Sequence, residues 1–174
     1  MAGIHMAKEP DLLARLQIAS IDTPEVIVTA HYNPKEIQID RSVPWQTHDS
    51  RDNRAWYKRE DLPQHDLEYT GAEPRTMSIE LLFDGYEANL SVEPIVDRLD
   101  ELASIRDLES LEEAKRAPRV CMVTWGTGQR PFRCVIESLS VKYTMFSRIG
   151  VPLRATCTLK LKEAVRVVPA KKRA

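Results

Sequence analysis

Three segments of this chain alternate apolar and polar residues with a period of two. They are residues 75–83, 138–145 and 153–162. Successive side chains of a β-strand point to opposite faces of the sheet, so this period predicts strands with one buried and one solvated face. Because nearly every residue from 119 to 163 belongs to such a run or to a turn, we expect a mainly β chain.

Shorter patterns extend the predicted sheet toward the N-terminus. Residues 11–20 lead into a strand, and Asp22-Thr23-Pro24 predicts a turn. Residues 25–32 then alternate, which together with the preceding strand indicates a hairpin. On one face of that run we expect Val26, Val28, Ala30 and Tyr32. Asn33-Pro34 should end the strand, because proline has no N–H for the ladder.

One helical segment interrupts the strands. Ile95, Leu99 and Leu102 recur at helical spacing, and Ser91 can cap a first turn that contains Pro94. Residues 107–116 fit a second, shorter helix or an extension of the first, so the helical insertion is assigned to residues 92–116. The expected fold is a β-barrel or sandwich of roughly six to eight strands with a lateral helix.

The length and composition fit a single globular domain. The chain has 174 residues, of which 43% are hydrophobic, which is enough for a core. We expect a flexible N-terminus over residues 1–10, one domain over residues 11–163 and a basic flexible tail over residues 164–174.

The charge and hydropathy patterns disfavour two classes of partner. The net charge of −1 gives no strong field to attract nucleic acid or an anionic membrane. No apolar run approaches the roughly 20 residues that span a bilayer, and residues 1–9 lack the apolar core of a signal peptide. We therefore expect no nucleic-acid partner, no membrane insertion and no Sec-type export.

Residues 46–74 differ from the rest of the domain. The segment is dense in charge and poor in aliphatic residues, and a loop of this length is uncommon in a compact domain. It is either a disordered insertion or an extended arm that orders against a neighbouring subunit. Aromatic residues are frequent interface anchors and favour the arm. The candidate contact residues are Trp45, Trp56, Tyr57 and Tyr69.

No pattern in the sequence predicts catalysis. Cys121, Cys134 and Cys157 lie in strand-like runs without metal-clip spacing, so we expect buried, reduced core residues. His48 with Asp49 and Asp52, or His65 with Asp66, could be drawn as metal or acid–base groups, but solvated loop charges explain them better. No nucleophile-elbow, phosphate-loop or zinc-protease motif occurs. We therefore expect no catalytic, metal or cofactor site and no cofactor.

The last two strands each have one apolar and one wholly polar face. The polar positions carry small hydroxyl groups and lysines. They are Ser138, Ser140, Lys142, Thr144, Thr156, Thr158, Lys160 and Lys162. This pattern fits a half-exposed antiparallel sheet. It equally fits a sheet that lines a water-filled channel, and periodicity alone does not separate the two interpretations.

A series of short motifs runs along most of the chain, over residues 14–163. Its members are Tyr32-Asn33-Pro34-Lys35-Glu36, Ser42-Val43-Pro44-Trp45, the strand from Arg75 through Phe83-Asp84-Gly85-Tyr86 to Glu87, residues 118–126, residues 135–146, residues 150–155 and residues 159–163. In this order, the series resembles the contractile injection system tube protein family.

The resemblance implies a phage tail-tube-like fold and a structural role. In that family, hexameric rings join strands from all copies into one β-barrel around a lumen, and they link the baseplate spike or hub to the inner tube. The implied partners are further copies of this chain, the inner-tube protein, the spike or hub protein and other baseplate proteins. The implied place is a phage-tail-like particle that assembles in the bacterial cytoplasm and is then released or membrane-associated.

Several roles stay open at this point. Longer family members carry a lysin-motif domain after this region, whereas residues 164–174 alone follow here, so a short form is expected. The long charged arm favours an adaptor ring over the main inner-tube subunit. Two alternatives belong to other functional classes. One is a small monomeric β-barrel that binds a ligand in its mouth, and the other is a hydrolase with a site in residues 46–74.

Overall fold

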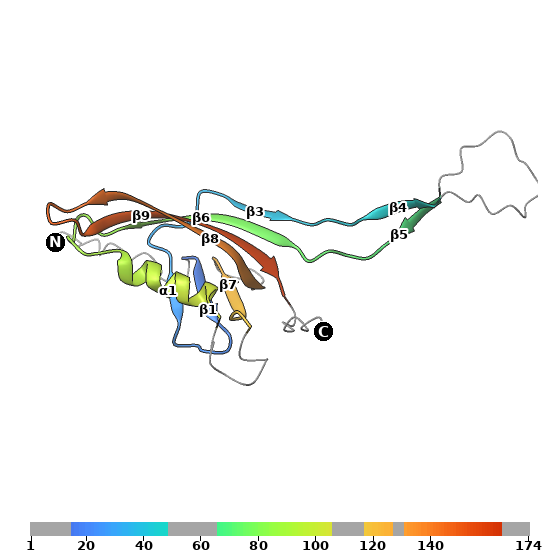
Figure 1. Cartoon of the computed structure of the whole chain (residues 1–174), viewed down its shortest axis with the longest axis horizontal. Coiled ribbons are helices and arrows are strands. Elements are labelled where there is room, and N and C mark those ends of the chain that lie inside the picture. The colour runs from blue at the N-terminus through green and yellow to red at the C-terminus, as the bar shows by residue number, and fades with distance from the viewer. Residues whose placement is uncertain (1–14, 49–65, 106–116, 127–130, 165–174) are drawn as a thin grey trace, which may run out of the picture.

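The computed structural model describes residues 15–48, 66–105, 117–126 and 131–164 (Figure 1). Within them the strands are β1 (Gln17–Ser20), β2 (Ile27–Thr29), β3 (Ile37–Asp40), β4 (Trp45–His48), β5 (Asp66–Tyr69), β6 (Thr76–Asp84), β7 (Cys121–Thr124), β8 (Phe132–Phe146) and β9 (Pro152–Glu163), and the helix is α1 (Glu93–Ala103). The prediction of a mainly β fold with a lateral helix is confirmed.

Seven of these strands form one sheet in the order β2-β1-β7-β8-β9-β6-β3. Every pairing in it is antiparallel. Strands β4 and β5 form a separate two-stranded ribbon. Among the described residues, β2 and β3 are the outermost strands of an open sheet. A single copy therefore does not close the barrel that the sequence suggested.

The sheet curls so that its two halves enclose the core. Strand β7 pairs with only the first part of β8, at Phe132–Cys134. Beyond that point the long strands β8, β9 and β6 form one layer, and β1, β2, β7 and α1 lie beneath it (Figure 1). Buried residues from both layers, such as Ile18, Val123 and Leu159, belong to one apolar cluster. The layers are thus held together by burial of apolar surface.

Helix α1 docks on the core through Val96, Leu99 and Leu102, which are its buried residues. The Ser91 hydroxyl accepts a hydrogen bond from the Glu93 amide (3.2 Å), and a proline stands in the first turn. The proline agrees with the predicted helix start. The N-cap is Val92, which makes no side-chain cap hydrogen bond, so the predicted cap at Ser91 lies one residue too early. The helix ends at Ala103, and the predicted helix over residues 107–116 lies outside the described residues.

The strand expected over residues 25–32 is shorter than the pattern indicated. Val26, Val28 and Ala30 are buried as predicted, but Tyr32 is exposed. The Ala30 amide donates to the Leu16 carbonyl (2.8 Å), after which the chain turns away from β1. The Asn33 side-chain oxygen accepts from the Leu16 amide (2.8 Å), which stabilises this turn.

The three cysteines are buried free thiols, as the sequence predicted. Cys121 and Cys134 are Cα partners across β7 and β8. Burial raises the pKa of Cys121 to about 11, of Cys134 to about 12 and of Cys157 to about 11. All three therefore stay protonated and act as small apolar core residues.

Two ion pairs fasten the ends of β9. Arg75 Nε and Nη2 donate to the two carboxylate oxygens of Glu163 (3.0 and 2.6 Å), and Arg154 donates to Asp84. The hydrogen bonds from Arg75 lower the pKa of Glu163, and those from Arg154, followed by the Tyr86 amide, lower the pKa of Asp84. The pairs link β9 to β6 at both ends of their ladder.

We predict that Leu99→Ala lowers the free energy of unfolding by about 2–5 kcal/mol, because it leaves a cavity where the helix meets the sheet. The matched control is Leu90→Ala, since Leu90 is 63% exposed whereas Leu99 is fully buried. We expect the control to stay within about 0.5 kcal/mol of the wild type. Urea unfolding followed by circular dichroism measures both. Equal effects for the two leucines would contradict the docking of α1.

We predict that Glu163→Gln lowers the free energy of unfolding near neutral pH by at most about 1 kcal/mol, because the pair is partly exposed. The folded-state pKa of Glu163 is lowered, so the ion pair stabilises the fold above the ordinary value of 4.5. That contribution is lost as pH falls through the folded-state pKa.

Urea unfolding of wild type and variant from neutral to acid pH checks this expectation. The difference between the two proteins should shrink toward zero in acid. Glu137→Gln is the control, because its carboxylate lies 4.0 Å from Lys162 Nζ and both side chains are about half exposed. A difference that stays constant across the acid range would count against the Glu163 pair.

Candidate channel-lining face and subunit edges

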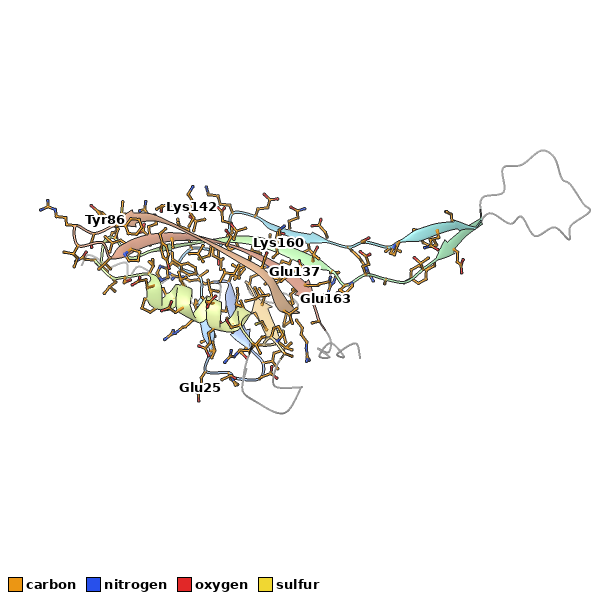
Figure 2. All side chains as sticks on the ribbon, in the orientation of Figure 1. Glu25, Tyr86, Glu137, Lys142, Lys160 and Glu163 are labelled. Carbon is orange, nitrogen blue, oxygen red and sulfur yellow. The ribbon has the colours of Figure 1, made fainter. Side chains whose placement is uncertain are left out.

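A continuous polar face covers the outside of the long strands. Pairing places Ser138 of β8 beside Lys160 of β9, Lys160 beside Ser78 of β6, and Ser78 beside Gln38 of β3. The neighbouring row runs from Ser140 through Thr158 to Glu80, and these side chains point away from the buried face that holds residues such as Leu159. In Figure 2, Lys142 and Lys160 lie along the long strands, and Glu25 lies on the opposite side of the molecule.

The structure brings most of the predicted channel-lining residues together. Exposed side chains on this face include Ser138, Ser140, Lys142, Thr158, Lys160 and Lys162, and Thr156 is half-buried among them. Thr144 departs from the pattern. A bulge between Tyr143 and Met145 shifts the register, and Met145 takes the position beside Arg154. Thr144 is therefore out of register with the ladder, although a strict period of two had placed it on the polar face.

The sequence-based prediction placed only residues of the last two strands on the polar face and missed the residues that β6 and β3 contribute to it. Ser78 and Glu80 alternate with buried residues in the sequence, so the signal for a polar face was present. Their position beside the lysines of β9 depends on the β6–β9 pairing, across a sequence gap that holds the helix and β7. The short β3 adds Gln38 and Asp40, whose side chains are hydrogen-bonded (3.1 and 3.2 Å).

A hollow of about 480 Å³ lies where the loop between β2 and β3 overhangs the polar face. Tyr32, Lys35 and Glu36 form one side, and Glu80 and Thr158 are among the residues on the other. Among the described residues, no group of three His, Cys, Asp or Glu side chains could hold a metal ion. The hollow is a feature of the polar face.

The block of long strands ends in two free edges. On one side, β8 pairs with β7 no further than Cys134, so its remainder pairs with β9 alone among the described strands. On the other side, β6 is the one partner of β3 within the part of the chain that the structure describes. Because β3, β6, β9 and β8 follow one another antiparallel, the two edge strands run in opposite directions. Free edges of this kind are templates for pairing with another chain.

Hydrogen bonds show which groups of the edge strand β3 are free to pair. The Gly85 amide and the Arg75 carbonyl are hydrogen-bonded to β9. The N–H and C=O groups of one residue point to the same neighbouring strand, and the direction alternates along the chain. The backbone groups of odd-numbered β6 residues therefore point toward β9, and those of even-numbered residues point toward β3. Ser78 is the partner of Gln38, so the backbone groups of Gln38 point toward β6. The next residue, Ile39, therefore directs its amide outward, away from the sheet. The same reasoning applies to β2, where Val28 faces Ile18 and Ile27 directs its amide outward.

The predicted arm begins as a hairpin that projects from the sheet. Strands β4 and β5 lie beyond the ends of β3 and β6, away from the turn that joins β8 to β9 (Figure 1). Trp45 and Tyr69 are Cα partners with ring centroids 5.6 Å apart, and both are more than half exposed, as is Leu67. Trp56 and Tyr57, the other predicted contact residues, lie outside the described residues.

Hydrogen bonds join the two strands of the arm near its base. The Thr70 amide and hydroxyl both donate to the Pro44 carbonyl (3.3 and 3.0 Å). Arg75, where the arm rejoins β6, bonds Glu163 and places its guanidinium 5.4 Å from the centre of the Phe132 ring. The arm thus exposes aromatic rings beyond the end of the sheet.

Comparison with known proteins agrees with this architecture. The family model described as contractile injection system tube protein matches residues 13–172, which is most of the chain. No curated protein matches it. Among the described residues, no helix is long and apolar enough to cross a membrane. The chain belongs to the contractile injection system tube protein family, as a structural component that assembles with other parts of such a machine.

Proposed function

We propose that this chain forms a hexameric ring around a lumen and acts as an adaptor between the baseplate spike or hub and the inner tube. The observation that carries the proposal is the pair of antiparallel free edges on β8 and β3. Copies related by rotation would place β8 of one beside β3 of the next. That seam is antiparallel at every junction, as in the sheet itself.

The two faces of the sheet suit such a ring. The apolar face is already covered by α1 and the short strands, whereas the polar face has no second layer among the described residues. With strands about 4.8 Å apart and tilted by about 40°, a hexamer of this four-strand block would close a barrel roughly 50 Å across. The hydroxyl groups and lysines would then line a water-filled lumen.

The projecting arm supports the adaptor role over the main inner-tube subunit. Its exposed aromatic rings lie beyond the end of the sheet, where they can contact a different protein along the ring axis. The proposed work is mechanical: the ring is held in the loaded machine and moves outward with spike and tube when the sheath contracts. The subunit catalyses no reaction in this scheme.

We predict that Ile39→Pro prevents ring formation, because proline removes an outward-directed amide on β3. The measurement is native mass spectrometry, with negative-stain electron microscopy to detect rings. Ile27→Pro is the matched control, since Ile27 is the equivalent exposed residue on β2, 37% exposed against 43% for Ile39. The wild type and the control should give hexameric rings, and Ile39→Pro should give folded monomers.

A wild-type protein that stays monomeric under all assembly conditions would contradict the ring. Rings from Ile39→Pro as abundant as those of the wild type would show that β3 is not the seam. Long tubes formed by the wild type alone would favour the main inner-tube role. A monomer that binds a small molecule would favour the ligand-binding alternative.

We predict that replacing Trp45 and Tyr69 together by alanine leaves the hexamer intact and removes binding to the hub protein. Both rings lie on the hairpin and contact each other rather than the core, so the fold should tolerate the change. Co-sedimentation of wild-type and variant rings with purified hub and inner-tube proteins measures this. Unchanged binding to both partners would contradict a contact role for the arm.

A further inference from the structure

The charges on the polar face are divided between its two halves. On β8 and β9 the lysines are Lys142, Lys160 and Lys162. On the side of β3 and β6, Asp40 and Glu80 are exposed on this face, and Glu36 lines the hollow beside it. One half is therefore mainly basic and the other mainly acidic, although the whole chain is nearly neutral.

The remaining charged groups near this face offset the division only in part. Arg154 is paired with Asp84, and Glu137 lies 4.0 Å from Lys162. Lys35 lines the hollow with Glu36 and Glu80 and offsets one of their charges. Arg41, next to Asp40, acts electrostatically on Glu163, at the base of the arm.

The two halves meet when copies associate edge to edge. Lys142 stands on β8, the edge strand of the basic half, and it has no ion pair among the described residues. Glu36 directly precedes β3, the edge strand of the acidic half, and Asp40 is its last residue. Bringing β8 of one copy beside β3 of another therefore places opposite charges together. Two β8 edges, or two β3 edges, would place like charges together.

We propose that Lys142 of one copy lies against the acidic edge formed by Glu36 and Asp40 of the next copy, and that this charge match selects the β8-to-β3 seam. The proposal rests on the proposed ring and names the contact that orients its subunits. Complementary charges at an interface favour the correct partner surface and penalise like-charged ones. Salt screens such a contact, since the Debye length falls to about 3 Å at 1 M salt.

The test is a charge swap across the seam. Lys142→Glu makes both edges acidic, and the double substitution Glu36→Lys with Asp40→Lys makes both edges basic. Each variant should need an at least about tenfold higher protein concentration for half-assembly into hexamers. A chain with all three substitutions restores opposite charges and should assemble near the wild-type concentration. Mass photometry across a dilution series measures assembly, and circular dichroism confirms that each variant is folded.

Lys160→Glu is the matched control. It makes the same charge reversal on the same face. Lys160 lies on β9, however, between Ser138 and Ser78 of its own chain, so it does not stand at the seam with another copy. This variant should assemble as the wild type does. Rings of Lys142→Glu at wild-type concentrations, or a triple variant that folds but does not assemble, would overturn the charge match and leave the ring intact. A wild type that forms no rings would overturn the ring as well.

Discussion

The pairing of β8 with β9 is the constraint on which the rest of the structure depends. The two strands are joined by a short turn and pair over most of their length, with register shifts at three places. Because side chains alternate along both, this one pairing puts Leu139 and Leu159 into the core and Ser138 and Lys160 into water. The bulges let the long strands bend while the alternation is kept on either side of each bulge. The curved, two-faced layer follows from that geometry.

A curved layer with one covered face still has strand edges whose backbone groups lack partners. Helix α1 and the short strands cover the apolar face, but no described strand pairs with β8 beyond Cys134 on the side away from β9, or with the outer side of β3. Backbone amides such as that of Ile39 then face outward. In a free monomer such edges invite unspecific pairing. In the proposed ring, pairing with identical copies would give these outward amides partners, and the order β3-β6-β9-β8 would make that pairing antiparallel without rearrangement of the chain.

The arm and the seam divide the contacts of the proposed ring between two parts of the molecule. The seam uses backbone groups and the charges at the strand edges, which act sideways between neighbours. The arm uses aromatic rings beyond the end of the sheet. A ring built this way can contact its axial partner without altering its own closure.

Local patterns in the sequence were sufficient to identify the main strands and the helix of this fold. The period-two runs identified β6, β8 and β9, the helical spacing of Leu99 and Leu102 identified α1, and the spacing of the cysteines excluded a metal clip. Tertiary structure decided the rest. Strand order depends on contacts between segments far apart in the chain, so neither the placement of Ser78 beside Lys160 nor the free edge of β3 was readable from alternation. Thr144 lies at a bulge, which depends on the partner strand and so was not readable from alternation. Tyr32 is exposed because the β1–β2 ladder ends where Ala30 bonds Leu16. The sequence by itself determined which residues could share a strand face, since that is a property of one strand. Which faces and edges lie side by side was decided by pairing across the whole sheet.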